Sequence, residues 1–356
     1  MKKLSLAIIG YGGMGAYHSI QLQRASDLFE ISGIYDIDSS RYEIARENKI
    51  KNYDCFHSRE DVANDPNTNV VLIATPNDLH LEYVRYFAKA GKNIICEKPV
   101  ALSSAEYAEM LSICKQNGVV FMVHQNRRWD ADFLTVKKMY EENKLGELWR
   151  IESRVQGGNG IPGDWRKFEE KGGGMMLDWG VHLIDQMVYM LPELPESVYC
   201  WYSYAEGFEV DDGFRLELNY KNGMTVEIAV DTACFIPLPR WMVYGKEGTA
   251  VINDWDISGK IVKPIFSKEV KIAGIQAGNG FTKTMAYRTA ESIVENELEK
   301  VYPEDNAFYK EFYDVVVNHK QPLIRMEQVM TVMKIMEAAK ISALEHKVVF
   351  IEKEEL

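Results

Sequence analysis

The chain has 356 residues, of which 46% are hydrophobic and 26% are charged, and its formal net charge is −12. This balance is typical of a globular protein and excludes disordered and collagen-like chains. At about 100–200 residues per domain, the length predicts two domains. An acidic surface repels phosphate backbones, and no stretch combines clustered Lys and Arg with aromatic residues, so we expect no nucleic-acid partner.

Membrane and export signals are also weak. No run reaches the roughly 18 apolar residues that a membrane span requires, so we expect no membrane partner. The apolar run Leu4–Ile9 is shorter than the apolar region of about 7–15 residues in a signal peptide, and glycines follow it where a cleavage site would lie. The 5 cysteines are scattered and show no C-x-x-C spacing. These features predict a cytoplasmic protein with reduced thiols.

The first part of the chain alternates between strand-like and helix-like segments. Leu4–Ile9, the turn Gly10–Gly15, the helical stretch Ala16–Ala25 and the apolar run Phe29–Tyr35 form a βαβ pattern. The alternation continues in the predicted strands Val70–Ala74, Asn93–Cys96 and Val119–His124 and the predicted helices Leu79–Ala90 and Ser104–Asn117. This order predicts an α/β fold with a doubly wound parallel sheet of the Rossmann type over residues 1–125.

After about residue 126 the pattern changes, and we assign residues 126–356 to a second α/β domain. A helix near Asp132–Asn143, a strand Glu147–Val155, a glycine-rich loop and a helix Met176–Met190 come first. The strand-like runs that follow predict a mostly antiparallel sheet: Ser197–Tyr204, Gly213–Tyr220, Met224–Asp231, Trp241–Tyr244 and Thr249–Asn253. We expect the helical stretch Glu327–Glu345 to pack back against the first domain.

The glycine turn carries a dinucleotide fingerprint. Gly10, Gly12 and Gly15 match G-x-G-x-x-G between a strand and a helix, and Asp36 ends the second strand about 20 residues on. In this context the backbone of the turn, with Gly13 and Met14, approaches a pyrophosphate at the helix N-terminus, and Asp36 accepts from ribose hydroxyls. Asp36 repels a 2′-phosphate, so we expect NAD rather than NADP, although nearby Arg41 weakens this preference. The alternative is a tight turn without a ligand.

Two further loops follow predicted parallel strands at the edge where α/β sheets bind ligands. The residues that we assign to cofactor contacts there are Thr75, Pro76, Asn77, His80, Glu97 and Lys98. Lys98 follows a buried strand and precedes a proline, so we expect a held side chain that can stabilise a developing alkoxide. The alternative for an isolated lysine is a solvated surface position.

Asp178 and His182 lie four residues apart on a predicted helix and therefore share a face. A carboxylate beside a histidine raises its basicity and fixes its orientation, so His182 is a candidate general base. Two alternatives compete with this reading. One is a surface Asp/His pair, and the other is a metal site with Asp185 as a third ligand; we expect no metal.

Several other polar and aromatic residues are candidates for contacts with a polyol substrate. The stretch after the last parallel strand offers Asn126 and Arg127, whose alternative role is capping and hinge packing. The glycine-rich loop offers Trp165 and Arg166, and the stretch near residue 306 offers Asn306 and Tyr309.

Together these motifs resemble the Gfo/Idh/MocA oxidoreductase family, the glucose–fructose oxidoreductase and inositol dehydrogenase group. The residues that carry the resemblance, in the family's order, are Gly10, Gly12, Gly15, Asp36, Thr75-Pro76-Asn77, Glu97-Lys98-Pro99, Asp178 and His182. The stretch from His124 to Phe133 resembles bacterial scyllo-inositol dehydrogenase-like members. The resemblance implies a nicotinamide at the domain cleft and a large open sheet that mediates a homodimer or homotetramer.

The resemblance further implies a reaction on a sugar or cyclitol. His182 would remove the proton from a ring hydroxyl, Lys98 would stabilise that oxygen, Asp178 would position His182 or Lys98, and hydride would pass to the nicotinamide. Two other functions stay open. An enzyme that retains its NAD could cleave a glycosidic bond by transient oxidation, or the chain could be a non-catalytic NAD-binding sensor.

Overall fold

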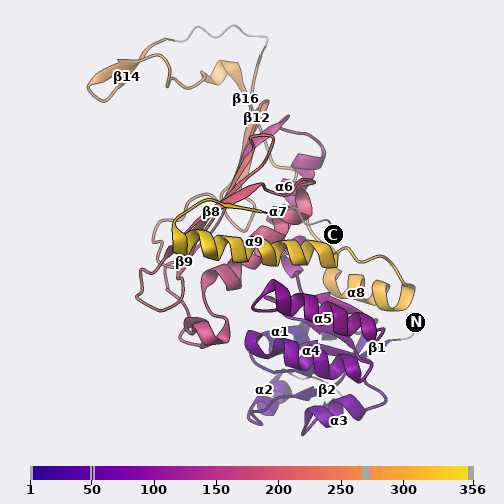
Figure 1. Ribbon diagram of the computed structural model, residues 1–356. Coiled ribbons are helices and arrows are strands. Elements are labelled where there is room, and N and C mark those ends of the chain that lie inside the picture. The colour runs from indigo at the N-terminus through magenta and orange to yellow at the C-terminus, as the bar shows by residue number, and fades with distance from the viewer. Residues whose placement is uncertain (1–2, 49, 51–52, 267–272, 352–356) are drawn as a thin grey trace.

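The computed structural model describes residues 3–48, 50, 53–266 and 273–351. Its N-terminal part is a parallel sheet in the strand order β3-β2-β1-β4-β5-β6, with helices on its faces (Figure 1). The strands are β1 (Leu4–Ile9), β2 (Phe29–Tyr35), β3 (Asp54–Cys55), β4 (Val70–Ile73), β5 (Asn93–Cys96) and β6 (Phe121–Val123). The helices are α1 (Gly13–Arg24), α2 (Arg41–Glu47), α3 (Arg59–Asn64), α4 (His80–Lys89) and α5 (Ser104–Gln116).

The predicted doubly wound sheet is therefore confirmed. The side chains of β1 and β4 are buried along their whole length, as continuous apolar strands covered on both faces must be. Because all these strands run parallel, the loops after β1, β2, β4 and β5 meet at one edge of the sheet. That edge faces the second part of the chain.

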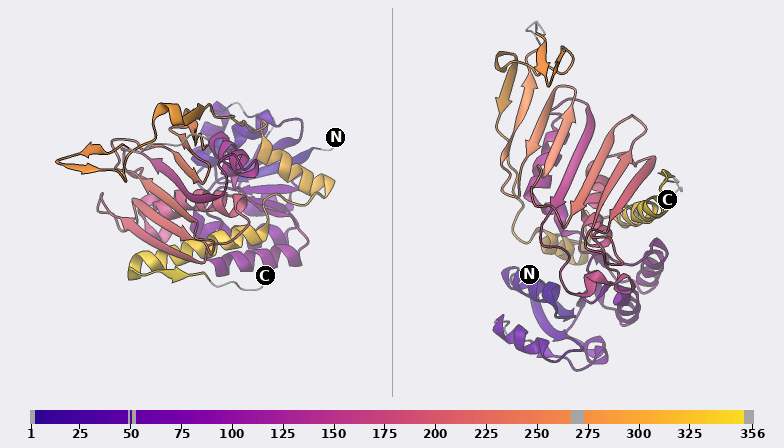
Figure 2. Two further views of the ribbon diagram at one scale, coloured as in Figure 1. Left: turned by 90° about the horizontal axis from the view of Figure 1, so that it is seen from above. Right: turned by 90° about the vertical axis from the view of Figure 1, so that its left-hand side faces the viewer.

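The second part contains a large mixed sheet in the order β16-β13-β12-β11-β7-β10-β9-β8-β17. Its strands are β7 (Leu148–Gln156), β8 (Ser197–Ser203), β9 (Gly213–Asn219), β10 (Thr225–Asp231), β11 (Trp241–Gly245), β12 (Gly248–Ile252), β13 (Gly259–Pro264), β16 (Ile293–Asn296) and β17 (Val349–Phe350). The mostly antiparallel prediction is confirmed, with one exception: β7 inserts between β10 and β11 and pairs with β10 in parallel. The short hairpin β14 (Ile275–Ala277) and β15 (Gly280–Thr282) projects away from the sheet (Figures 1 and 2).

Four long helices accompany this sheet: α6 (Ala131–Glu141), α7 (Val181–Met190), α8 (Ala307–Asn318) and α9 (Met326–Glu345). Helix α8 has no counterpart among the predicted elements. Helix α9 packs on β8 and α7 and also contacts α5 of the first sheet. At that contact the backbone N–H and the hydroxyl of Ser104 donate to the carboxylate of Glu337 at 2.7 and 2.8 Å.

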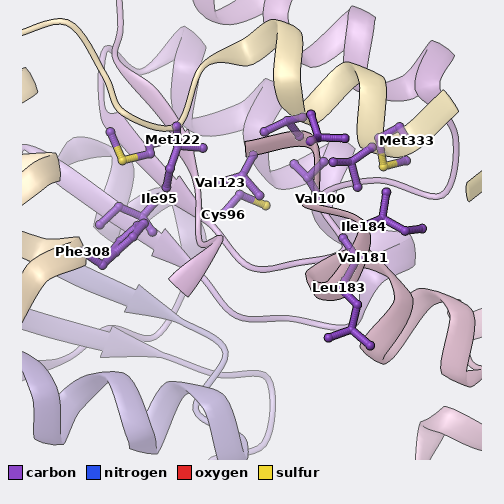
Figure 3. Packing of buried hydrophobic residues seen from close by; sticks show 14 of the residues in the cluster. Ile95, Cys96, Val100, Met122, Val123, Val181, Leu183, Ile184, Phe308 and Met333 are labelled. Carbon is purple, nitrogen blue, oxygen red and sulfur yellow. The ribbon is translucent and has the colours of Figure 1, made fainter. Parts of the chain in front are cut away.

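The two parts share a continuous apolar core where they meet. Figure 3 shows Cys96 and Val123, at the ends of β5 and β6, on one side of Val100, and Val181 and Ile184 of α7 with Met333 of α9 on its other side. This packing holds the carboxyl end of β5 against the start of α7. It therefore brings together two segments that each carry candidate site residues. Among the described parts of the chain, no helix is both long and apolar enough to cross a membrane.

Candidate active site

In the glycine turn after β1, two glycines pack closely against neighbouring backbone and two others have free space beside them. Gly10 has φ +87°, and a Cβ there would lie 2.7 Å from the carbonyl oxygen of Ala74. A Cβ on Gly15 would lie 2.2 Å from the carbonyl oxygen of Gly10, so this glycine serves helix–strand packing. By contrast, a Cβ on Gly12 or Gly13 would meet nothing within 4 Å. The turn thus leaves room for a phosphate at the start of α1.

A cavity of about 590 Å³ extends from this turn along the carboxyl edge of the sheet. Asp36 follows β2 and Lys98 follows β5, so three strand spacings, or about 14 Å, separate the two ends of the cavity. Its lining includes the predicted cofactor residues Gly10, Gly12, Gly13, Met14, Asp36, Arg41, Thr75, Pro76, Asn77, Glu97 and Lys98. The elongated shape, the open glycines and the acid at one end fit a dinucleotide.

Asp36 is held by the backbone at the far end of this cavity. Its Oδ2 accepts from the N–H of Tyr11 at 2.6 Å, and its Oδ1 accepts from the N–H of Asp38 at 2.9 Å. The Arg41 side chain lies in the same wall and pairs with Asp38 at 3.4 Å. The cavity thus presents both an acid and a guanidinium where a ribose would lie.

At the other end, Lys98 reaches across the cleft to Asp178. Its Nζ lies 2.9 Å from Oδ1 of Asp178 and 3.0 Å from the carbonyl oxygen of the same residue. Nε of Arg166, from the glycine-rich loop, donates to Oδ2 of Asp178 at 3.2 Å. Burial opposes the charge on Asp178, but Lys98 and Arg166 outweigh it and lower the pKa of the carboxyl. These contacts therefore fix the ammonium group of Lys98 at one end of the 590 Å³ cavity, which we call the cofactor cavity.

The expected pairing of Asp178 with His182 is wrong. Residues Met176–Gly180 form a π-helical turn before α7 begins, so Asp178 and His182 lie in two different helical elements. Asp178 turns to Lys98 and Arg166, whereas Nδ1 of His182 is buried and has no hydrogen-bond partner within residues 3–48, 50, 53–266 and 273–351. Burial, Lys98 and Arg127 hold the pKa of His182 well below its ordinary range, so the expected rise in basicity is absent.

A second cavity, of about 480 Å³, lies at the ends of β7 and β10. The ring of Trp179 is 6.1 Å from that of His182, and the Arg127 guanidinium lies 4.2 Å above the Trp179 ring. Trp255 and Asp231 also line the cavity. Indole faces beside polar groups suit a polyhydroxylated ring, which has both apolar C–H faces and hydroxyl edges.

The two tryptophans are absent from the predicted site. Trp179 adjoins Asp178 in the sequence, and that adjacency could have indicated it. Trp255 lies in a loop after β12, more than 70 residues along the chain, and no local pattern points to it. Of the predicted substrate contacts, Arg127 lines this second cavity, whereas Trp165 and Arg166 line the cofactor cavity.

Five other residues that the sequence analysis considered have different environments. His80 is buried, and its ring nitrogens contact the backbone carbonyls of Thr75, Pro99 and Val100 instead of the cavity. Asn126 begins a short 3-10 helix and lines neither cavity. Buried Asp185 pairs with Arg128 at 2.7 Å, which removes it as a metal ligand beside His182. The hydroxyl of Tyr309 is buried 2.7 Å from Nδ1 of His18, while Asn306 precedes α8 as its N-cap.

Sequence comparison places both parts of the chain in known families. The family described as "Oxidoreductase family, NAD-binding Rossmann fold" matches residues 4–125, and the Gfo/Idh/MocA C-terminal domain matches residues 133–251. The structure is similar to that of an NAD-binding protein from Listeria innocua, with TM-score 0.93 and 44% identity, covering 99% of this chain and 100% of that one.

Two relatives have named activities. The chain is 25% identical to the scyllo-inositol 2-dehydrogenase (NADP(+)) of Bacillus subtilis over 353 residues, which cover 98% of this chain and 96% of the relative. It is 27% identical to the 2,7-anhydro-N-acetylneuraminate hydratase of Escherichia coli over 265 residues, which cover 71% of this chain and 70% of the relative.

Proposed function

Since the chain belongs to the Gfo/Idh/MocA family of NAD(P)-binding oxidoreductases, we propose that it is an NAD-dependent dehydrogenase of a sugar, polyol or cyclitol. The reaction would convert a secondary hydroxyl to a ketone, or the reverse. The observation that carries this proposal is the position of Lys98. Its ammonium group lies 2.9 Å from Asp178 at the end of the cofactor cavity, and its charge lowers the pKa of buried His182.

The bound nicotinamide would supply the hydride acceptor, and the protein would handle the proton and the charge. His182 is neutral near pH 7, because burial, Lys98 and Arg127 hold its pKa well below its ordinary range, and a neutral imidazole can accept the hydroxyl proton. Lys98 would donate a hydrogen bond to the same oxygen and stabilise the charge that develops there. Asp178 would hold Lys98 in place, together with Arg166.

The choice of NAD over NADP rests on Asp36. A 2′-phosphate at this end of the cavity would meet the carboxylate that the backbone of Tyr11 and Asp38 holds in place. Arg41, the one candidate for a compensating contact there that the sequence suggested, pairs with Asp38. We therefore infer a preference for NAD in this chain.

The proposal is tested by the formation of reduced nicotinamide with purified protein, NAD or NADP and a panel of cyclitols, hexoses and simple glycosides. We expect turnover with at least one polyol and NAD. The Lys98→Met variant should lose turnover, because methionine lacks the positive charge. It should still bind the cofactor, because the methionine side chain is of similar length. Tight NAD binding without reduction by any panel member, or turnover that Lys98→Met leaves unchanged, would contradict the proposal.

A redox-neutral reaction is a second candidate, favoured by the similarity to a relative that is named a hydratase. An enzyme of this kind would keep its NAD and return the hydride to the substrate in each turnover. It would convert a glycoside or anhydro sugar without net accumulation of reduced nicotinamide. Assay of the same panel for released sugar separates the two candidates.

We also propose that the protein forms a homodimer or homotetramer through the large sheet. The face of that sheet away from the core carries Trp201, which is 48% exposed, and the ion-paired side chains of Arg150, Glu152 and Glu227. Light scattering of the purified protein tests this proposal. A monomer at micromolar concentration would contradict it.

A further inference from the structure

A cluster of two histidines and one glutamate is buried behind Lys98. Nε2 of His18 and Nδ1 of His124 each lie 2.7 Å from the same oxygen of Glu97, and we call these three residues the His–Glu–His cluster. Their side chains are 0%, 2% and 5% exposed, for His18, His124 and Glu97 respectively. The cluster joins α1 to the ends of β5 and β6. On its outer side, His18 contacts the hydroxyl of Tyr309 on α8 at 2.7 Å.

The residue types could suit a metal ion, but the spacing argues against one. The three ligand atoms lie within 4.8 Å of one another. Zinc binds imidazole nitrogen and carboxylate oxygen at about 2.0–2.2 Å, which places tetrahedral ligands about 3.3 Å apart. The observed 2.7 Å contacts to Glu97 are too short for that geometry. They place both rings within hydrogen-bond distance of the carboxylate instead.

One of the two contacts has hydrogen-bond geometry, and a proton at Nε2 of His18 satisfies it. Nδ1 of His124 lies 2.7 Å from the same oxygen without an aligned hydrogen bond among the described residues, and it can donate to that oxygen. The second oxygen of Glu97 accepts from the backbone N–H of Lys98 at 3.1 Å. Burial opposes the charge on Glu97, but the contacts with His124 and His18 outweigh it and hold the pKa of the carboxyl well below its ordinary range. Burial lowers the pKa of His18, which agrees with a neutral ring.

The cluster adjoins the reactive end of the cofactor cavity. Glu97 lines that cavity, whereas its neighbour Lys98 reaches across it to Asp178. The cluster stands three strands away from Asp36, at the end that the proposed function assigns to the nicotinamide. A fixed anion is thus built into the wall at the point where the cofactor changes charge.

We propose that the His–Glu–His cluster holds a negative charge beside the nicotinamide and thereby favours the oxidised cofactor over the reduced one. The inference rests on the proposed function, because it needs a nicotinamide at this end of the cavity. An oxidised nicotinamide ring is cationic, and the ring becomes neutral when it accepts a hydride. A neighbouring anion therefore stabilises the oxidised form alone. His18 and His124 are positioning residues, which act by keeping Glu97 ionised.

The test is the ratio of the dissociation constants of NADH and NAD, measured by fluorescence titration and competition without any substrate. Glu97→Gln removes the charge of the side chain and keeps its shape. The affinity for NAD should therefore fall by about tenfold relative to the affinity for NADH. This is the effect expected of one unit charge at about 10 Å in a medium of effective dielectric about 20. Glu109→Gln removes an exposed charge on α5 and should leave the ratio unchanged.

Two histidine variants provide the second arm. His124→Asn keeps a donor near the position of Nδ1 and should preserve the wild-type ratio. His124→Leu removes the donor, so the buried carboxyl should take up a proton and the ratio should move in the same direction as in Glu97→Gln. A wild-type ratio in both Glu97→Gln and His124→Leu, or stoichiometric zinc in the purified protein, would overturn the inference. Failure of the wild-type protein to bind either nucleotide would instead overturn the proposed function as well.

Discussion

Nζ of Lys98 and Oδ1 of Asp178 lie 2.9 Å apart, although 80 residues separate them in the chain. The lysine follows a strand of the parallel sheet, and the aspartate lies in the π-helical turn that precedes α7. The apolar core between the two parts of the protein holds these two segments next to each other (Figure 3). This contact joins the two parts of the protein at the proposed reaction centre.

Removal of the carboxylate that holds Lys98 should therefore impair chemistry more than binding. We expect Asp178→Asn to lower kcat by about 10²-fold or more, because the ammonium loses its anchor, while the KM for NAD changes little. Steady-state kinetics with the best panel substrate tests this. As a control, Asp164→Asn removes another carboxylate that contacts Arg166 but not Lys98, and its kcat should stay near wild type. Equal losses in the two variants would contradict the assigned role.

His182 should act as a base that stays neutral in mildly acidic solution. Burial, Lys98 and Arg127 hold its pKa well below 6.5, so kcat/KM at pH 6.5 should stay close to its value at pH 7.5. His182→Gln should lower kcat by about 10²–10⁴-fold, because the amide cannot accept the proton. A pH profile of kcat/KM from pH 5 to 9 checks the first statement. A marked loss of rate between pH 7.5 and pH 6.5 would contradict it.

Asp36 should determine the choice of cofactor. Asp36→Ser removes the charge that repels a 2′-phosphate and leaves Arg41 in the same wall of the cavity. We expect the ratio of kcat/KM for NADP to that for NAD to rise by about tenfold or more. Asp38→Ser, which frees Arg41 but keeps Asp36, is the matched control and should shift the ratio less. Kinetics with both cofactors measure the two ratios.

Asp211 should reduce the stability of the protein as the pH rises. This carboxyl accepts the N–H of Met176 at the start of the π-helical turn, and burial raises its pKa from 3.8 to about 7. Between these values the folded state binds a proton that the unfolded state lacks, so its contribution to the free energy of unfolding falls with increasing pH, by up to about 4 kcal/mol.

The Asp211→Asn variant isolates this contribution, because its amide oxygen can still accept from Met176 and cannot ionise. The difference in free energy of unfolding between the variant and the wild type should increase from pH 5 to pH 8, in favour of the variant. Urea unfolding at both pH values measures it. A difference that is independent of pH would show that Asp211 does not titrate in the folded protein between these pH values.

The parts of the site that depend on local sequence could be predicted. The glycines of the turn and Asp36 lie in one βαβ unit, so their spacing alone places them around a phosphate and a ribose. Lys98 follows from the rule that ligands bind where parallel strands end. These predictions needed only the strand order of a common fold.

The remaining parts depend on contacts between distant segments. Asp178 lies in the π-helical turn Met176–Gly180 and pairs with Lys98 and Arg166, which come from distant segments that its own local sequence does not indicate. The His–Glu–His cluster needs α1, β5 and β6 to meet, and Trp255 reaches the site from beyond β12. His80 looked like a cavity residue because it follows Asn77, yet its ring satisfies buried backbone carbonyls.

The central claim is that hydride passes between a substrate carbon and a nicotinamide held beside Lys98 and His182. The most direct measurement uses a panel polyol that carries deuterium on its ring carbons, with NMR spectroscopy of the nicotinamide after turnover. The account predicts deuterium at the reactive carbon of the reduced nicotinamide with wild-type protein, and none with Lys98→Met. Conversion of the polyol to a ketone without deuterium in the nicotinamide would contradict the account.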